Sequence, residues 1–191
     1  MAQHAFSDTG AREIGPGRLP VHDPSRLRDP KLLESLELFR HVSPESIELY
    51  LEKCRVIKLE TGDVLLDPEC RNNEVYVVLS GRLRVYLETL ENPPLTALRQ
   101  GQCAGEMSII EDKDPSAIVV AAEATELMVI DHETLWGLVN SSHAFARNLL
   151  SVLSERVRSD NEMIADSIVI MKQYEHSATT DALTGLHNRY W

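Results

Sequence analysis

Residues 101–117 are Gly101-Gln102-Cys103-Ala104-Gly105-Glu106-Met107-Ser108-Ile109-Ile110-Glu111-Asp112-Lys113-Asp114-Pro115-Ser116-Ala117, and the rest of the chain is organised around them. Two glycines lead into a glutamate, a short apolar turn, an acidic loop and a Ser-Ala pair that opens a strand. Backbone amides at the start of such a turn favour an anion, and Gly105 lets a ligand approach the backbone closely. We therefore expect an anion-binding segment, called the cassette below, within a β-domain.

Short strand patterns lie on both sides of the cassette. Alternating apolar and polar residues, with turns at Gly62, Gly81 and Pro93-Pro94, predict roughly eight short strands between residues 54 and 131. Before them, Leu32, Leu33, Leu36 and Phe39 have helical spacing, and Pro44 opens a second helix. We predict an α+β, mainly β fold: a jelly-roll or β-roll sandwich with flanking short helices and a long C-terminal dimerisation helix.

That long helix is expected because no Gly or Pro occurs between Asn148 and Ala178. In a heptad frame the a positions are all apolar, whereas the d positions are half polar. The a positions are Leu150, Val157, Ile164, Met171 and Ala178, and the d positions are Leu153, Asp160, Ser167 and Tyr174. Thirty helical residues span about 45 Å, more than a small domain. We favour pairing with a second copy over packing against the helix's own domain.

Composition limits the function. A net charge of -11 disfavours a nucleic-acid partner, which requires a basic face. No apolar run is long enough for a membrane span, and no export signal is visible, so we expect a cytoplasmic protein. Three widely spaced cysteines indicate free thiols in a reducing compartment. No catalytic or metal-binding constellation appears, so catalysis by these residues has the least support.

The order of cap helices, Gly62, the turn Leu79-Ser80-Gly81-Arg82-Leu83, Gly105-Glu106-Met107 and Ser116-Ala117 resembles a cyclic-nucleotide-binding domain of the catabolite-activator type. The resemblance covers about residues 30–161. It implies that Gly105 and Glu106 bind the ribose and that the phosphate lies on the amides of the turn, with Ser116 and Ala117 among the ligand-binding residues. Further ligand contacts that it implies are Met107, Val85 and Thr96 in the pocket, and Asp160 and Asn161 near the purine. Residue by residue, Glu106 can also be a cap of the following turn, and Met107 a core residue.

One position departs from that family. An arginine that pairs with the cyclic phosphate precedes the serine there, and this chain has Pro115, which has neither a charge nor a backbone donor. Alternation predicts that Arg82, Arg84 and Arg99 point away from the pocket. Arg156 is the best replacement cation, and Lys113 the second.

The chain ends in a second resemblance. Thr180-Asp181-Ala182-Leu183-Thr184-Gly185-Leu186-His187-Asn188-Arg189 is similar to the opening D-x-L-T-G-L-x-N-R of GGDEF diguanylate cyclase domains. It implies that a longer parent protein makes cyclic di-GMP from GTP. We predict four parts: a flexible leader (1–28), a cyclic-nucleotide-binding-like domain (29–142), a signalling helix (143–178) and the start of a GGDEF domain (179–191).

Together these features predict a regulatory sensor module that forms a homodimer through the 143–178 helix and controls a downstream cyclase. Cyclic AMP or cyclic GMP is the possible ligand, and no cofactor or metal is required. The alternative is a ligand-free dimerisation or protein-interaction module with a degenerate pocket.

Overall fold

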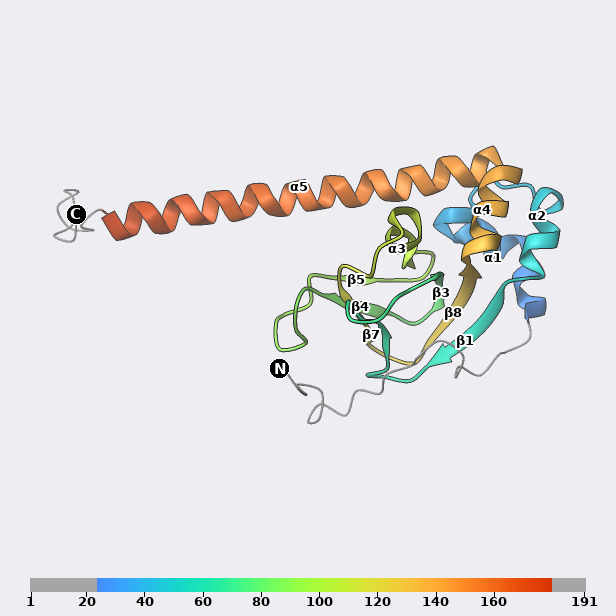
Figure 1. Cartoon of the computed structure of the whole chain (residues 1–191), viewed down its shortest axis with the longest axis horizontal. Coiled ribbons are helices and arrows are strands. Elements are labelled where there is room, and N and C mark those ends of the chain that lie inside the picture. The colour runs from blue at the N-terminus through green and yellow to red at the C-terminus, as the bar shows by residue number, and fades with distance from the viewer. Residues whose placement is uncertain (1–23, 180–191) are drawn as a thin grey trace. The chain divides into compact units, whose positions relative to one another are not determined.

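The computed structural model describes residues 24–179 and divides the chain into two compact units, one ending at Leu149 and one starting at Leu150. The first unit holds short helices and two sheets (Figure 1). Its helices are η1 Pro24–Arg28, α1 Pro30–Ser35, η2 Glu37–Phe39, α2 Pro44–Leu51, α3 Glu106–Glu111 and α4 His132–Ser141. Its strands are β1 Arg55–Leu59, β2 Val64–Leu66, β3 Glu74–Ser80, β4 Leu83–Tyr86, β5 Thr96–Leu98, β6 Cys103–Ala104, β7 Ile118–Ala121 and β8 Thr125–Asp131. Helix α5, His143–Thr179, begins in the first unit and continues through the second.

The eight strands form two four-stranded antiparallel sheets, ordered β1-β8-β3-β6 and β2-β7-β4-β5. Side chains from the facing sides of both sheets form one apolar cluster, which we call the inter-sheet core. Its members are Ile57, Leu59, Leu65, Leu66, Tyr76, Val78, Leu83, Val85, Leu98, Ala104, Val119, Ala121, Leu127 and Val129. This arrangement confirms the predicted two-sheet jelly-roll class.

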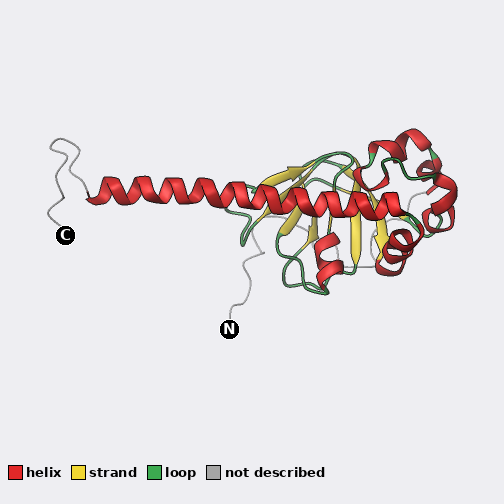
Figure 2. Ribbon diagram, turned by 90° about the horizontal axis from the view of Figure 1, so that it is seen from above, coloured by secondary structure: helices red, strands yellow, loops and turns green. Residues whose placement is uncertain are grey.

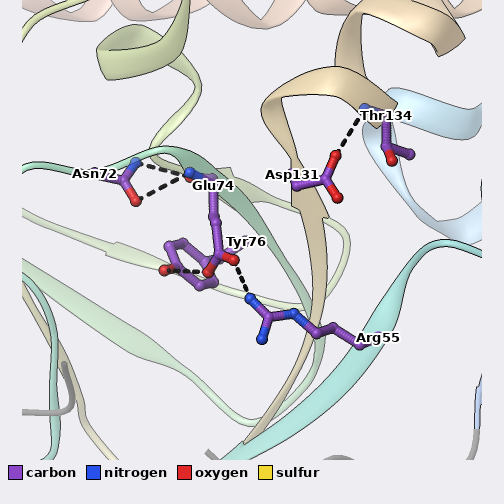
Figure 3. Close-up of polar contacts among 6 residues, drawn as sticks. All are labelled: Arg55, Asn72, Glu74, Tyr76, Asp131 and Thr134. Atoms are coloured by element: carbon purple, nitrogen blue, oxygen red, sulfur yellow. Dashed lines mark hydrogen bonds and ion pairs between the residues drawn. The ribbon is translucent and has the colours of Figure 1, made fainter. Parts of the chain in front are cut away.

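Most of the short helices gather on one side of the strands (Figure 2). Alternate residues on β3 and β8, such as Val77 and Met128, are buried but lie outside the inter-sheet core, and α4 contacts both strands. Asp131 starts α4 by accepting a hydrogen bond from the Thr134 amide at 2.7 Å (Figure 3). The sheet therefore has an inner face toward the other sheet and an outer face toward the helices.

The first cap helix differs from its predicted form. The spacing of Leu32, Leu33, Leu36 and Phe39 predicts one helix, but the backbone turns extended at Leu36 and restarts as η2. The reason is tertiary, because the Glu37 amide donates to the Gly101 carbonyl at 2.9 Å. The last residues of the predicted leader, Pro24–Arg28, form η1, and Leu27 is fully buried.

The root of α5 belongs to the first unit. The Phe145 ring meets Phe39 edge to face, with 5.2 Å between centroids. The Asn148 amide donates to the Leu38 and Arg40 carbonyls at 3.1 and 2.7 Å. These contacts fix the start of α5 to η2.

In the second unit, α5 exposes a regular apolar stripe. Four of the predicted a positions, Leu150, Val157, Ile164 and Met171, are between 58% and 64% exposed, and Ile168 is also exposed. Within residues 24–179 no helix has both the length and the apolar character that a membrane crossing requires.

Glu126 on β8 gives the fold a pH-dependent contact. Its carboxylate accepts from Lys58 at 2.9 Å and Arg26 at 3.0 Å. The hydrogen bond from Lys58 is the main reason that the pKa of Glu126 lies below its usual value of 4.5. Because the pKa of Glu126 is lower in the folded state than in the unfolded state, the ionised carboxylate stabilises the fold at any pH above its unfolded-state pKa. This stabilisation is lost as the pH falls through the folded-state pKa. We expect Glu126→Gln to lower the melting temperature at pH 7, and the difference from the parent to shrink below pH 4.5. A constant difference across this range would contradict that result.

Candidate functional site

The cassette contains a short helix where its sequence predicts an apolar turn. β6 ends at Ala104, Gly105 takes a left-handed conformation (φ 87°), and α3 follows over Glu106–Glu111. Asp112, also left-handed (φ 52°), ends the helix, and β7 begins at Ile118. The segment therefore links an edge strand of one sheet to an inner strand of the other.

Gly105 is required by a close backbone approach. A Cβ atom there would lie 2.5 Å from the Glu74 carbonyl oxygen and 2.8 Å from Asn72 Nδ2. The side-chain amide of Asn72 donates hydrogen bonds to the backbone carbonyl of Glu74 at 2.7 Å and to that of Gly105 at 3.3 Å. Asn72 therefore connects Gly105 of the cassette to β3. The sequence patterns did not single it out, because it lies in a polar loop without periodicity.

Glu106 is enclosed. The residue is 1% exposed, and its carboxylate lies 3.8 Å from the Cys103 thiol. Cys103 is the register partner of Val77, whereas the next residue, Ala104, belongs to the inter-sheet core. Because strand residues alternate, the carboxylate lies beside a side chain on the outer face. The ribose role of Glu106 stays a prediction, and it requires this side chain to turn toward a ligand.

The second half of the cassette, which is predicted to bind the phosphate, has a buried proline and paired charges. Pro115 is buried and Ser116 exposed, while Ala117 packs against the inter-sheet core. Lys113, the predicted second replacement cation, is 72% exposed and donates to Glu111 at 2.7 Å. Arg71 forms an ion pair with Asp112. These two cations are therefore already neutralised by acidic residues of the cassette itself.

The remaining predicted contacts divide between the two units. Val85 belongs to the inter-sheet core, Thr96 lies opposite it in register but is exposed, and Met107 is half-buried. Arg84 and Arg99 are exposed, as alternation predicts. On α5, Arg156 is half-buried and Asp160 and Asn161 are exposed. These three belong to the second unit, and their ligand roles stay predictions.

A polar group that the sequence did not reveal lies beside Gly105. The Glu74 carboxylate forms an ion pair with Arg55 and accepts from the Tyr76 hydroxyl at 3.0 Å (Figure 3). Burial and the neighbouring Glu74 raise the pKa of Tyr76, so its hydroxyl stays protonated and donates. A Cβ atom on Gly105 would lie 3.5 Å from the Tyr76 ring. The Arg55–Glu74–Tyr76 group therefore lies next to Gly105 of the cassette.

A metal site finds no support in the region that the structure covers, where no cluster of three or more histidine, cysteine, aspartate or glutamate side chains could hold an ion. The three cysteines are free thiols, two of them buried.

Comparison with known proteins agrees with this architecture. The family model for the cyclic nucleotide-binding domain matches residues 56–142. The Cyclic AMP receptor protein of Thermus thermophilus is 29% identical over 123 residues, which are 63% of this chain and 57% of that protein. Acetyltransferase Pat of Mycolicibacterium smegmatis is 27% identical over 126 residues, or 65% of this chain and 38% of that one. The chain thus spans less than two thirds of the length of these relatives.

Among solved structures, the Thermus thermophilus Catabolite Activator Protein superposes with a TM-score of 0.60 at 27% identity. The match covers 70% of this chain and 63% of that one. Residues 56–142 are therefore similar to a cyclic nucleotide-binding domain, within a two-sheet fold like that of the Catabolite Activator Protein.

Proposed function

We propose that this chain is the regulatory part of a diguanylate cyclase, in which two copies pair through α5 and pass the state of the nucleotide-binding-type domain to the catalytic domains. The observation that carries the proposal is the stripe of a positions on α5. Four large apolar side chains at intervals of seven residues are each more than half exposed. A second copy in parallel register would cover all four at once.

The root of α5 supports coupling between domain and helix. Asn148 and Phe145 hold α5 to η2, and η2 is itself tied to Gly101, the first residue of the cassette. A ligand that moves the cassette would therefore act on Glu37 and, through η2, on the start of α5. Such a ligand shifts the balance between two α5 arrangements only by its difference in affinity for them.

The catalytic partner is inferred from the motif at residues 180–189, which lie outside the described residues. It is supported by Acetyltransferase Pat, in which the region similar to this chain makes up only 38% of the protein. If the coding sequence continues past Trp191, a GG(D/E)EF signature downstream would support the cyclase, and its absence there would overturn that part.

Sedimentation tests the dimer directly. We expect the chain to sediment as a dimer, and a version ending at Asp160 to shift toward monomer because it loses Ile164 and Met171. If both sediment as monomers, the proposed role of α5 is wrong.

A ligand-free interaction module remains the second candidate function. The buried Pro115, the enclosed Glu106 and the neutralised cations of the cassette favour it. Calorimetry with cyclic AMP, cyclic GMP and cyclic di-GMP separates the two candidates. Heat with one of them supports the sensor, and no heat at millimolar ligand supports the ligand-free module.

If a cyclic nucleotide binds through the ribose contact, Glu106→Gln should weaken binding about tenfold, because a charged hydrogen bond contributes roughly 1.5–3 kcal/mol. The isosteric change keeps the volume of the buried side chain. Glu111→Gln is the matched control, since Glu111 ends the same helix but is exposed. An unchanged Kd for Glu106→Gln would remove Glu106 from the site.

A further inference from the structure

Arg55 lies on the inner face of the first sheet. Arg55 on β1 and Tyr76 on β3 are both register partners of Val129 on β8, which runs between them. Direct register partners point to the same face of a sheet. Because Tyr76 and Val129 belong to the inter-sheet core, the Arg55 side chain also points between the sheets, where it reaches Glu74 (Figure 3).

No other basic residue on the described strands shares this direction. The strands carry three such residues, Arg55, Lys58 and Arg84. Lys58 alternates with Ile57 and Leu59 of the inter-sheet core and binds Glu126 on the outer face. Arg84 alternates with Leu83 and Val85 and is exposed. A ligand between the sheets would therefore meet one strand cation.

The guanidinium has capacity for a ligand. It carries five N–H donors, and among the described residues it donates one hydrogen bond, to Glu74. The side chain is 34% exposed, so part of it is accessible. Glu74 is 17% exposed and is held in turn by the Tyr76 hydroxyl. The carboxylate therefore fixes the orientation of the guanidinium without occupying all its donors.

We propose that Arg55 binds the phosphodiester of a cyclic nucleotide in this chain and substitutes for the cation that Pro115 cannot supply, with Glu74 and Tyr76 as positioning residues. The inference rests on the ligand-sensing branch of the proposed function. A phosphodiester carries one negative charge, and an oriented arginine can meet two of its oxygens. Because Glu74 already offsets part of the arginine charge, the site should bind more weakly than one with an unpaired arginine.

Calorimetry with cyclic AMP and cyclic GMP tests the assignment. Arg55→Gln should weaken binding by at least about tenfold, the loss expected for one charge-assisted contact. Lys58→Gln is the matched control, since it removes an ion-paired cation from the same strand on the other face, and it should leave Kd unchanged. The double variant Arg55→Gln/Glu74→Gln leaves no unpaired buried charge, so it should also lose binding while melting like a folded protein.

A salt series and Tyr76→Phe address positioning. The parent's affinity should fall with ionic strength, and Arg55→Gln should flatten that dependence. Tyr76→Phe should weaken binding less than Arg55→Gln but keep the salt dependence, because the cation remains. A parent chain that binds neither nucleotide, or an Arg55→Gln variant with the parent's Kd, would overturn the inference. If the chain is a dimer that binds neither nucleotide, the proposal that α5 pairs two copies still holds. If the chain is a monomer that binds a nucleotide through Arg55, only the α5 proposal is wrong.

Discussion

Gly81→Ala is expected to destabilise the domain by about 4 kcal/mol, the sum of left-handed backbone strain and overpacking against neighbouring backbone. Gly81 has φ 85° in the turn between β3 and β4. A Cβ atom there would lie 2.5 Å from the Ala124 carbonyl oxygen, 2.6 Å from Thr125 Oγ1 and 2.8 Å from Thr125 Cα. Two of these atoms are backbone, so a rotamer change cannot relieve the overlap.

The turn at Gly81 also cannot easily move away from Thr125. The buried Thr125 hydroxyl accepts from the Arg82 amide at 3.2 Å and lies 2.7 Å from the Glu123 carbonyl, to which it donates. Separating the turns would leave these buried polar groups without partners, which is costly. The structure therefore offers no inexpensive relaxation.

Gly62→Ala is the matched control. Gly62 has a similar positive φ of 91°, but a Cβ atom there would meet nothing within 4 Å. Gly62→Ala should therefore lower the free energy of unfolding by about 1 kcal/mol, the cost of the left-handed backbone conformation alone. Urea unfolding of both variants measures the difference, and the melting temperature should fall by about 10 °C for Gly81→Ala. Equal losses for the two variants would show that the close contacts at Gly81 are relieved at little cost.

The sequence predicted those parts of the fold that depend on local patterns. Period-two alternation and turn residues predicted the strands, and Gly105-Glu106 predicted a turn at the place where α3 begins, because backbone conformation there depends on neighbouring residues. The break at Leu36 was not predicted, since a hydrogen bond from Glu37 to distant Gly101 overrides the helical spacing.

Arg55 was missed for a similar reason. Alternation on β1 shows that Arg55 shares a face with Ile57 and Leu59, but not which strands lie beside them. Only the order β1-β8-β3 places Val129 between Arg55 and Tyr76 and so brings Glu74 within reach. Such register between distant strands cannot be obtained from one segment. The sequence therefore indicated Arg156 and Lys113 as replacement cations, and not Arg55.

The largest effect on assembly is expected from Val157→Asp/Ile164→Asp. Both residues lie in the exposed stripe at successive a positions. In a parallel pair of helices, the change would place four carboxylates in two facing layers in place of four apolar side chains. Each layer then loses buried apolar surface and gains repulsion between like charges, in an interface that is partly shielded from water. We expect the dimer Kd to rise more than about 100-fold, which corresponds to about 2.7 kcal/mol.

Ser151→Asp/Ser159→Asp separates the stripe from the added charge. Both serines are exposed on the same helix, at positions b and c, so this variant adds the same charge away from the stripe. It should remain a dimer in sedimentation equilibrium, and circular dichroism should show the same helix content for both variants.

If the Val157/Ile164 variant stays dimeric, the stripe is not the interface. If both variants dissociate, charge on α5 opposes assembly without regard to position. Dissociation of the first variant alone identifies the heptad stripe as the dimer interface. Under the proposed function, a diguanylate cyclase that contains this chain should then lose activity with the same change, since its two catalytic domains would no longer be held together.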